Sequence, residues 1–218
     1  APTPKRNVNH FTIGSPSLST FSRLKDVIDY ENIEMRHLDE LEIPTGETID
    51  LPDDLAKVIQ GYAVKQKFRD KQAFKRELYK KYNLSPEVIE AMQPVELIKK
   101  TAEIVADNIS FVDGKDPDFN GFFEDDFHSG KGDCSMYTHQ MICLFSLLKE
   151  DNSKSRNVYI GQINFSDKYI HDWNVVYVMK KDGLELSMVD PTFLDSMGKL
   201  DAVDDFHLWA VWKTLFYR

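Results

Sequence analysis

Cysteine is scarce in this chain, whose 218 residues include only Cys134 and Cys143. The two lie nine residues apart on what the apolar pattern predicts to be one helix, and at about 100° per residue they point to opposite sides of it. They can neither form a disulfide with each other nor share a metal ion. This excludes a disulfide-stapled fold and a zinc module, and we expect no metal and no other cofactor.

Long apolar runs and an excess of positive charge are also missing. Hydrophobic residues make up 42% and charged residues 29% of the chain, as in ordinary globular domains, and no apolar run approaches the ~20 residues of a membrane helix. The formal charge of −9 disfavours nucleic acid, whose binding depends on clustered Lys and Arg. We therefore expect neither a membrane span nor a nucleic-acid partner.

The sequence leaves the compartment and the oligomeric state open. No basic-then-apolar leader opens the chain, yet it begins at Ala1 rather than Met, so removal of a leader on secretion is compatible with it. The shortage of cysteine fits a reducing compartment, and for that reason we favour the cytoplasm slightly.

Helical spacing of apolar residues dominates the first part of the chain. Short helices are predicted to begin near Ser17, Pro52, Phe74 and Pro86, the last after a Ser85 cap. A longer helix, over residues 94–109, keeps a period of 3.6 and is predicted to end near Asp113-Gly114.

The second part combines a buried helix with strands. Residues 115–133 show no period and are predicted to form a long loop. Residues 134–148 are apolar on nearly every side, which indicates a central buried helix. Runs rich in β-branched and aromatic residues then predict three strands, which are residues 157–165, 172–179 and 184–189. The fold class is therefore α+β, and an aromatic stripe over residues 204–218 is predicted to dock on the core.

Three residues of this second part have the order expected of a thiol enzyme. Cys134 opens the buried helix, His171 begins a strand and Asp190 ends the next one. The positive end of a helix macrodipole lowers the pKa of a thiol, and the free N–H groups of the first turn can stabilise an oxyanion. A histidine can take the proton of the thiol, while a carboxylate on its other ring nitrogen orients the ring. We therefore expect Cys134 as nucleophile, His171 as base and Asp190 as the orienting group.

The segments around these residues resemble three signature segments of the transglutaminase-like superfamily. They read Gly132-Asp133-Cys134-Ser135, His171-Asp172-Trp173-Asn174 and Val189-Asp190-Pro191-Thr192. The resemblance implies a papain-like core in which the cysteine helix packs on an antiparallel sheet. It divides the chain into a helical N-terminal region, residues 1–93, whose role is open, and a transglutaminase-like catalytic core, residues 94–218.

The resemblance also implies acyl transfer at a protein or peptide amide through a thioester. The acyl group would pass to water, as in a cysteine protease, deamidase or amidase, or to an amine, as in transglutamination. We lean to hydrolysis because the core is small. The alternative is a catalytically silent interaction module that keeps this fold, and a third interpretation is a structural protein whose helical first half binds a partner.

The strand register provides an internal test of this assignment. If residues 180–183 connect the last two strands, Asp190 lies opposite Trp173 and is a diagonal neighbour of His171 at roughly 7 Å. A two-residue connection at Asp182-Gly183 would instead place Asp190 opposite a position four residues from His171. We therefore predict the longer connection.

Other residues compete for roles in this site. His128 is the alternative base, whereas His139 lies about 140° around the helix from Cys134 and points elsewhere. Trp173 is expected to wall the site, and its indole N–H is an alternative donor to an oxyanion. Cys143 is expected in the core.

Acidic residues gather in the predicted loop before the cysteine. They are Asp116, Asp118, Glu124, Asp125 and Asp126. Some animal transglutaminases use calcium, but these residues lack the ordered ligand pattern of an EF-hand loop. We therefore predict a solvated acidic loop that favours cationic substrates, or a lysine amine as acceptor.

Overall fold

A computed structural model gives the fold of most of the chain. It describes residues 11–13, 33–44, 66–118, 120–166, 170–181, 183–198 and 200. The helices predicted to begin near Ser17 and Pro52 and the aromatic stripe over residues 204–218 lie outside these ranges.

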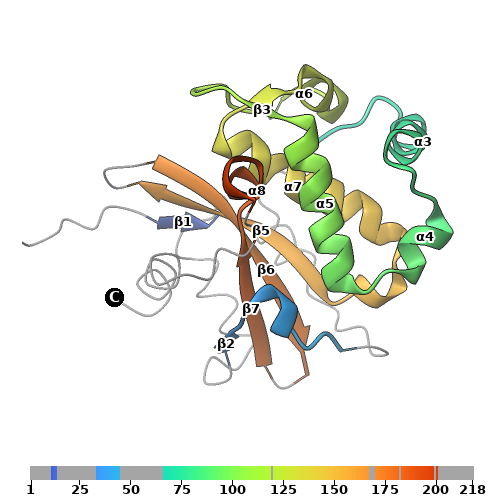
Figure 1. The fold of residues 1–218 in the computed structure, drawn as a ribbon, viewed down its shortest axis with the longest axis vertical. Coiled ribbons are helices and arrows are strands. Elements are labelled where there is room, and N and C mark those ends of the chain that lie inside the picture. Colours follow the sequence, from blue (N-terminus) through green and yellow to red (C-terminus); the bar gives the residue numbers. More distant parts are fainter. Residues whose placement is uncertain are drawn as a thin grey trace, which may run out of the picture.

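A five-stranded sheet forms one layer of the molecule, in the order β1-β5-β6-β7-β2 (Figure 1). β5, β6 and β7 form an antiparallel meander, β1 pairs antiparallel with β5, and β2 pairs parallel with β7. The bounds are β1 Phe11–Ile13, β2 Ile33–Met35, β5 Val158–Ser166, β6 Ile170–Lys180 and β7 Gly183–Val189. The three predicted strands are confirmed. β1 and β2 are strands in a region for which the sequence indicated helices, because three residues are too few to show a period of two.

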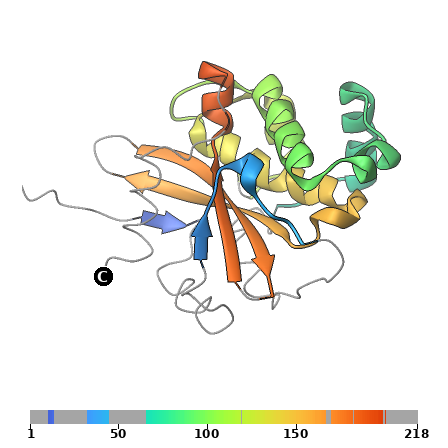
Figure 2. The same ribbon diagram turned by 60° about the horizontal axis from the view of Figure 1, so that its bottom comes forward.

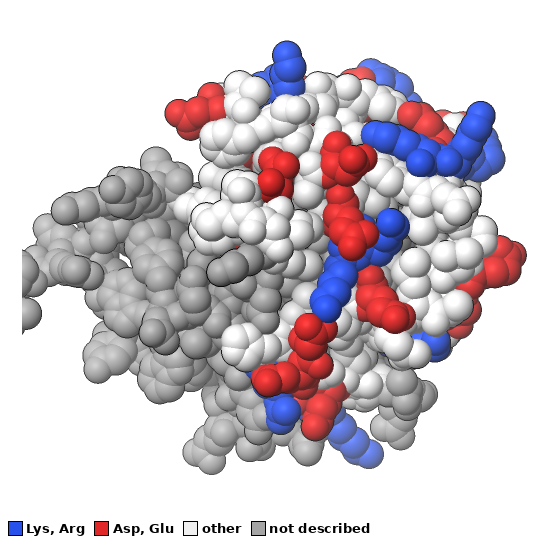
Figure 3. Space-filling model, in the orientation of Figure 1, with Lys and Arg blue, Asp and Glu red and all other residues white. Residues whose placement is uncertain are grey.

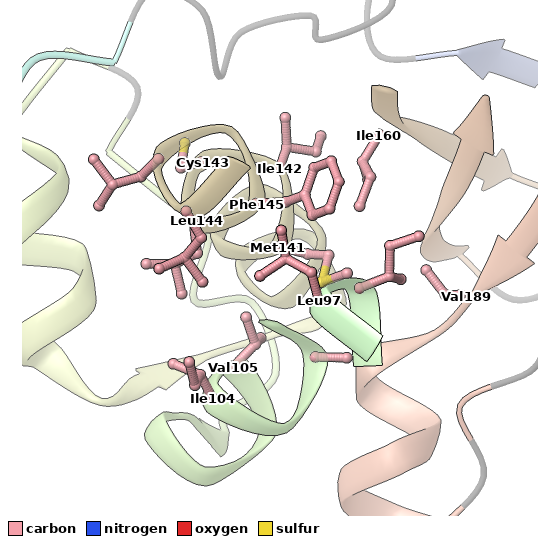
Figure 4. Packing of buried hydrophobic residues seen from close by; sticks show 14 of the residues in the cluster. Leu97, Ile104, Val105, Met141, Ile142, Cys143, Leu144, Phe145, Ile160 and Val189 are labelled. Carbon is pink, nitrogen blue, oxygen red and sulfur yellow. The ribbon is translucent and has the colours of Figure 1, made fainter. Parts of the chain in front are cut away.

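Helix α7 (Cys134–Leu148) packs across one face of this sheet, between β5–β6 and helix α5 (Pro94–Asn108) (Figures 1 and 2). Every residue from Met136 to Phe145 is buried. Figure 4 shows side chains from α5, α7, β5 and the end of β7 in one apolar cluster. Each large apolar side chain that leaves water here stabilises the fold by ~1.5–3 kcal/mol. The predicted central helix and the α+β class are confirmed.

Side-chain caps set the starts of the two described α-helices that precede α5. The Asp70 carboxylate accepts a hydrogen bond from Ala73 N, and the Ser85 hydroxyl accepts one from Val88 N, with Pro86 at the first helical position. These helices are α3 Lys71–Tyr82 and α4 Pro86–Ala91, and short 3-10 turns lie at η2 Leu38–Glu40, η4 Lys149–Asp151 and η5 Ser153–Ser155. α3, α4 and α5 begin where the sequence predicts them to within a few residues.

The segment predicted as one long loop, residues 115–133, contains a helix and a strand. Phe123 and Phe127 lie one turn apart on α6, and their rings pack on the ring of Phe74 with centroids 5.5 and 5.1 Å away. β4 follows α6 and pairs in parallel with β3. The bounds are β3 Ser110–Phe111, α6 Phe123–Ser129 and β4 Lys131–Gly132. The loop prediction was wrong because acidic residues between the two phenylalanines obscure a single helical turn.

The β6–β7 hairpin sets the register on which the site depends. Met179 pairs with Leu184, as the predicted register requires, and one further pair, Lys180 with Gly183, leaves two residues between the strands. The register is therefore correct, whereas the predicted four-residue connection is too long. Asp190 follows β7 directly.

Acidic and basic side chains are interspersed on the surface seen in Figure 3. Among the exposed pairs, the Arg69 guanidinium makes two hydrogen bonds of 2.6 Å to the Asp125 carboxylate. Exposed pairs stabilise a fold by only ~0–1 kcal/mol, so the apolar core dominates. Within the described ranges, no helix has the length and apolar character needed to cross a membrane.

Candidate active site

Cys134 is the first residue of α7 and carries a free, partly exposed thiol. The residue before it, Asp133, caps the helix: its Oδ1 atom accepts hydrogen bonds from Ser135 N at 3.0 Å and Met136 N at 3.4 Å. The sulfur therefore lies at the positive end of a 15-residue helix, where a negative charge is stabilised.

Close packing fixes the first turn of α7. A Cβ atom added to Gly132 would lie 2.2 Å from Met136 Cβ, so only glycine lets β4 run this close to the helix. On the other side, Asp133 N donates to Lys115 O at 3.2 Å, and the Ser135 hydroxyl lies 2.7 Å from Asp116 Oδ1. The strand and the segment after β3 together hold the thiol in place.

Asp190 is fully buried and its two carboxylate oxygens have different partners. Oδ2 accepts a hydrogen bond of 2.5 Å from His171 Nε2. Oδ1 accepts hydrogen bonds from Thr192 N at 3.0 Å and Phe193 N at 3.2 Å, which caps helix α8 (Pro191–Met197). The carboxylate thus orients the imidazole and starts a helix at the same time.

His171 is in contact with both other residues of the predicted triad. Burial alone would lower its pKa, but the hydrogen bonds to Asp190 and Cys134, together with the charges of these groups, raise the pKa of His171 to about 10. Because Nε2 is bonded to Asp190, Nδ1 is the ring nitrogen left for the sulfur. The structure therefore brings Cys134, His171 and Asp190 together.

Two aromatic rings pack against the imidazole. The ring centroid of Trp173 lies 5.9 Å from that of His171, at an interplanar angle of 30°, and the ring of Phe193 lies at 5.4 Å and 19°. Trp173 is fully buried, so it walls His171 from within the protein. The sequence reasoning missed Phe193, although proline directly after a capping Asp is a helix-start signal that would have placed it one turn beyond Asp190.

The other histidines have different surroundings. His128, the alternative base, is exposed on α6 with its Nε2 atom 2.9 Å from Glu77 Oε1. His139 is buried within α7, 3.7 Å from the Cys143 sulfur. Burial lowers the pKa of His139 to about 4 and raises the pKa of the Cys143 thiol. This second Cys–His pair is therefore neutral, and Cys143 is a core residue.

The acidic residues before Cys134 are only partly solvated. Glu124 and Asp126 are buried, and burial raises the pKa of Asp126. Glu124 accepts a hydrogen bond from Arg69 N, and Asp126 accepts one from Asp118 N. The prediction of a solvated loop was wrong for these two residues, which hold the segment together. Over the described part of the chain, no three His, Cys, Asp or Glu side chains are grouped to hold a metal ion.

A pocket of about 610 Å³ opens beyond the C-terminal end of α7, and no sequence pattern indicated it. Charged side chains of both signs line it, among them Glu87, Glu90, Lys149 and Arg156. A 15-residue helix is ~22 Å long, so the pocket lies far from Cys134.

The chain matches no protein-family model, no curated protein and no solved structure. Its function must therefore be inferred from the arrangement of Cys134, His171 and Asp190.

Proposed function

We propose that the chain is a cysteine-dependent acyl-transfer enzyme with a transglutaminase-like, papain-like core, which acts on an amide of a protein or peptide. The observation that carries the proposal is the position of His171, which contacts the thiol of Cys134 and the buried carboxylate of Asp190. A raised pKa of His171 keeps the imidazole protonated near neutral pH, so that its positive charge faces the sulfur of the proposed nucleophile.

The chemistry runs through a thioester. The Cys134 thiolate attacks the amide carbonyl carbon, and the electron pair of the C=O bond moves onto oxygen. When this pair returns, the C–N bond breaks and the amine or ammonia leaves with the proton of His171. Water then attacks the thioester, His171 takes its proton, and the carboxylic acid and the thiol are released. An amine in place of water would give a new amide.

The first turn of α7 offers a donor for the oxyanion. The N–H groups of Ser135, Met136 and Tyr137 are engaged by Asp133. Asp133 does not bind the Cys134 N–H. This N–H lies beside the sulfur and is therefore the donor that we propose for the oxyanion. Trp173, fully buried against His171, serves in this proposal as the wall that fixes the imidazole plane, while a donor role for its indole stays a prediction.

We favour water as acceptor because the core is small. The charge near the nucleophile concerns a separate question, which is the substrate. Asp116 reaches the Ser135 hydroxyl from an exposed position next to the nucleophile, so a cationic substrate group, or a lysine amine as acceptor, is compatible with the entrance. The choice between a protease, a deamidase or amidase and a transglutaminase is decided by products: a cut peptide, released ammonia with an acid, or a new amide.

The test combines thiol labelling with a substrate screen. Iodoacetamide should label Cys134 near neutral pH at least ~10-fold faster in the wild type than in His171→Ala, since one pKa unit is tenfold in the reactive fraction. His128→Ala is the matched control, because His128 lies on the surface against Glu77, and it should label like the wild type. Release of ammonia or an amine from peptide amides should vanish in Cys134→Ala. Equal labelling in the wild type and His171→Ala would refute the Cys–His pair.

A further inference from the structure

A buried tyrosine links the cysteine helix to the helix that carries the orienting carboxylate. Tyr137 lies one turn after Cys134 in α7 and has no exposed surface. Its hydroxyl is 2.6 Å from Asp195 Oδ2 on α8 and 2.9 Å from Ile109 O at the end of α5. The hydroxyl has one proton to donate, and the shorter distance and the charged acceptor favour the hydrogen bond to Asp195, which joins α7 to α8.

Helix α8 makes several contacts on which the site depends. Its cap, Asp190, binds His171, and Phe193 packs its ring on the imidazole. Seven residues are too few for a helix to be stable by itself, so its position depends on its neighbours. The cap fixes its first residues, Leu194 packs partly buried against the core, and Asp195 hydrogen-bonds the following turn to α7.

We propose that Tyr137 and Asp195 are positioning residues, which hold α8 on α7 so that the Asp190 carboxylate stays hydrogen-bonded to His171. Their importance for catalysis rests on the proposed function, whereas the geometric role does not. Burial, followed by the hydrogen bond to Asp195, raises the pKa of Tyr137. The hydroxyl therefore stays a donor at every pH at which the site could work.

The imidazole itself reports whether the link acts on it. The ionisable groups that face His171 are Cys134 from α7 and Asp190 from the end of β7, while Trp173 and Phe193 are uncharged. Titration of the His171 ring nitrogens by NMR therefore measures its contact with these two groups. Tyr137→Phe keeps the ring in the core and the charge of Asp195 but removes the hydroxyl. We expect it to lower the pKa of His171 by about one unit, or tenfold in the proton-binding constant.

Two further variants separate the hydrogen bond from charge and from general stability. Asp195→Asn removes the charge but keeps an oxygen that accepts from Tyr137, so it should titrate like the wild type. Tyr79→Phe is the matched control, because the Tyr79 hydroxyl makes a similar bond, 2.5 Å to Asp151 Oδ2, near the other end of α7. It should leave the pKa of His171 unchanged, even if its unfolding midpoint falls as far as that of Tyr137→Phe.

The His171 titrations test the positioning role of Tyr137 and Asp195 independently of the proposed acyl-transfer activity. A lower pKa of His171 in Tyr137→Phe but not in Tyr79→Phe supports it. If Tyr137→Phe does not fold, Asp195→Ala takes its place, because Asp195 is exposed. A His171 titration in the folded variant that matches the wild type overturns the proposal, whatever Cys134 does. Failure of the proposed function shows elsewhere, as equal labelling of Cys134 in the wild type and His171→Ala.

Discussion

Replacing Asp190 by asparagine separates the two tasks of this carboxylate. Asparagine caps a helix as well as aspartate does, so its oxygen can still accept from Thr192 N and Phe193 N, the bonds that start α8. The side-chain amide nitrogen then faces His171 Nε2 in place of Oδ2. Two donors cannot bond, so the protonated imidazole loses its partner while the helix keeps its cap.

The size of the effect follows from the lost bond. A hydrogen bond to a charged group contributes ~1.5–3 kcal/mol, and one pKa unit equals about 1.4 kcal/mol. The pKa of His171, about 10 in the native protein, should fall by about one to two units. The pH at which His171 loses its proton should fall by the same amount, to about 8–9, so the pH profile of Cys134 labelling should differ from that of the wild type mainly above pH 8.

The assay follows the labelling rate from pH 5 to 10, with modification measured at each cysteine by peptide mass spectrometry. Cys143 is an internal control, because it is buried and its thiol pKa is raised; its labelling reports unfolding. Asp190→Ala, which also loses the cap, should be less stable than Asp190→Asn by ~1 kcal/mol. If Asp190→Asn is folded and its rate profile coincides with that of the wild type, Asp190 does not orient His171 and the reasoning is refuted.

Three further predictions concern stability. Gly132→Ala should lower the free energy of unfolding by ~1–3 kcal/mol in urea titrations and slow labelling of the thiol, because its Cβ would overlap α7; an unchanged midpoint would contradict this packing. Because the pKa of His171 is raised from 6.5 to about 10, its protonation stabilises the fold fully below pH 6.5, and this contribution, at most ~5 kcal/mol, is lost as the pH rises to about 10. Unfolding measured across that window should decline less in His171→Ala, and parallel curves would rule the contribution out. Glu185→Gln should cost ~1–3 kcal/mol in thermal unfolding, since the buried Glu185 carboxylate pairs with Arg36 at 3.3 Å, and no loss would mean that solvent screens the pair.

The long elements could be predicted because burial leaves a repeat in their sequence. Residues 134–148 are apolar on nearly every side, and the helix found there has these bounds. The strands around Trp173 and Leu186 are rich in β-branched and aromatic residues. Of two possible hairpin registers, the one that brings Asp190 next to His171 was predicted, and the observed pairing has this register. The expectation that the three proposed catalytic residues meet came from their order along these elements and from the resemblance of their segments to a known family.

The short elements could not be predicted in the same way, because contacts with distant residues hold them. β1 and β2 are three-residue strands that exist by pairing with β5 and β7. α6 is stabilised by phenylalanine rings packed on α3. Helix α8 had a readable signal in Asp190-Pro191, but the sequence analysis placed Asp190 at the end of a strand, as the orienting group, and did not predict the helix that follows it. The contacts of Phe193 and Asp195 depend on how α8 lies on its neighbours, which no local pattern encodes.

Because Asp190 both caps α8 and binds His171, local opening of the helix and loss of the contact with His171 are one event. Whenever α8 opens locally, the amides of Thr192 and Phe193 lose their acceptor, and the same event frees the carboxylate from His171. Hydrogen exchange at the Thr192 and Phe193 amides therefore measures how often local opening of α8 separates Asp190 from His171. Slow exchange would describe an active site that stays assembled between encounters with substrate, and fast exchange one that is completed only when substrate arrives.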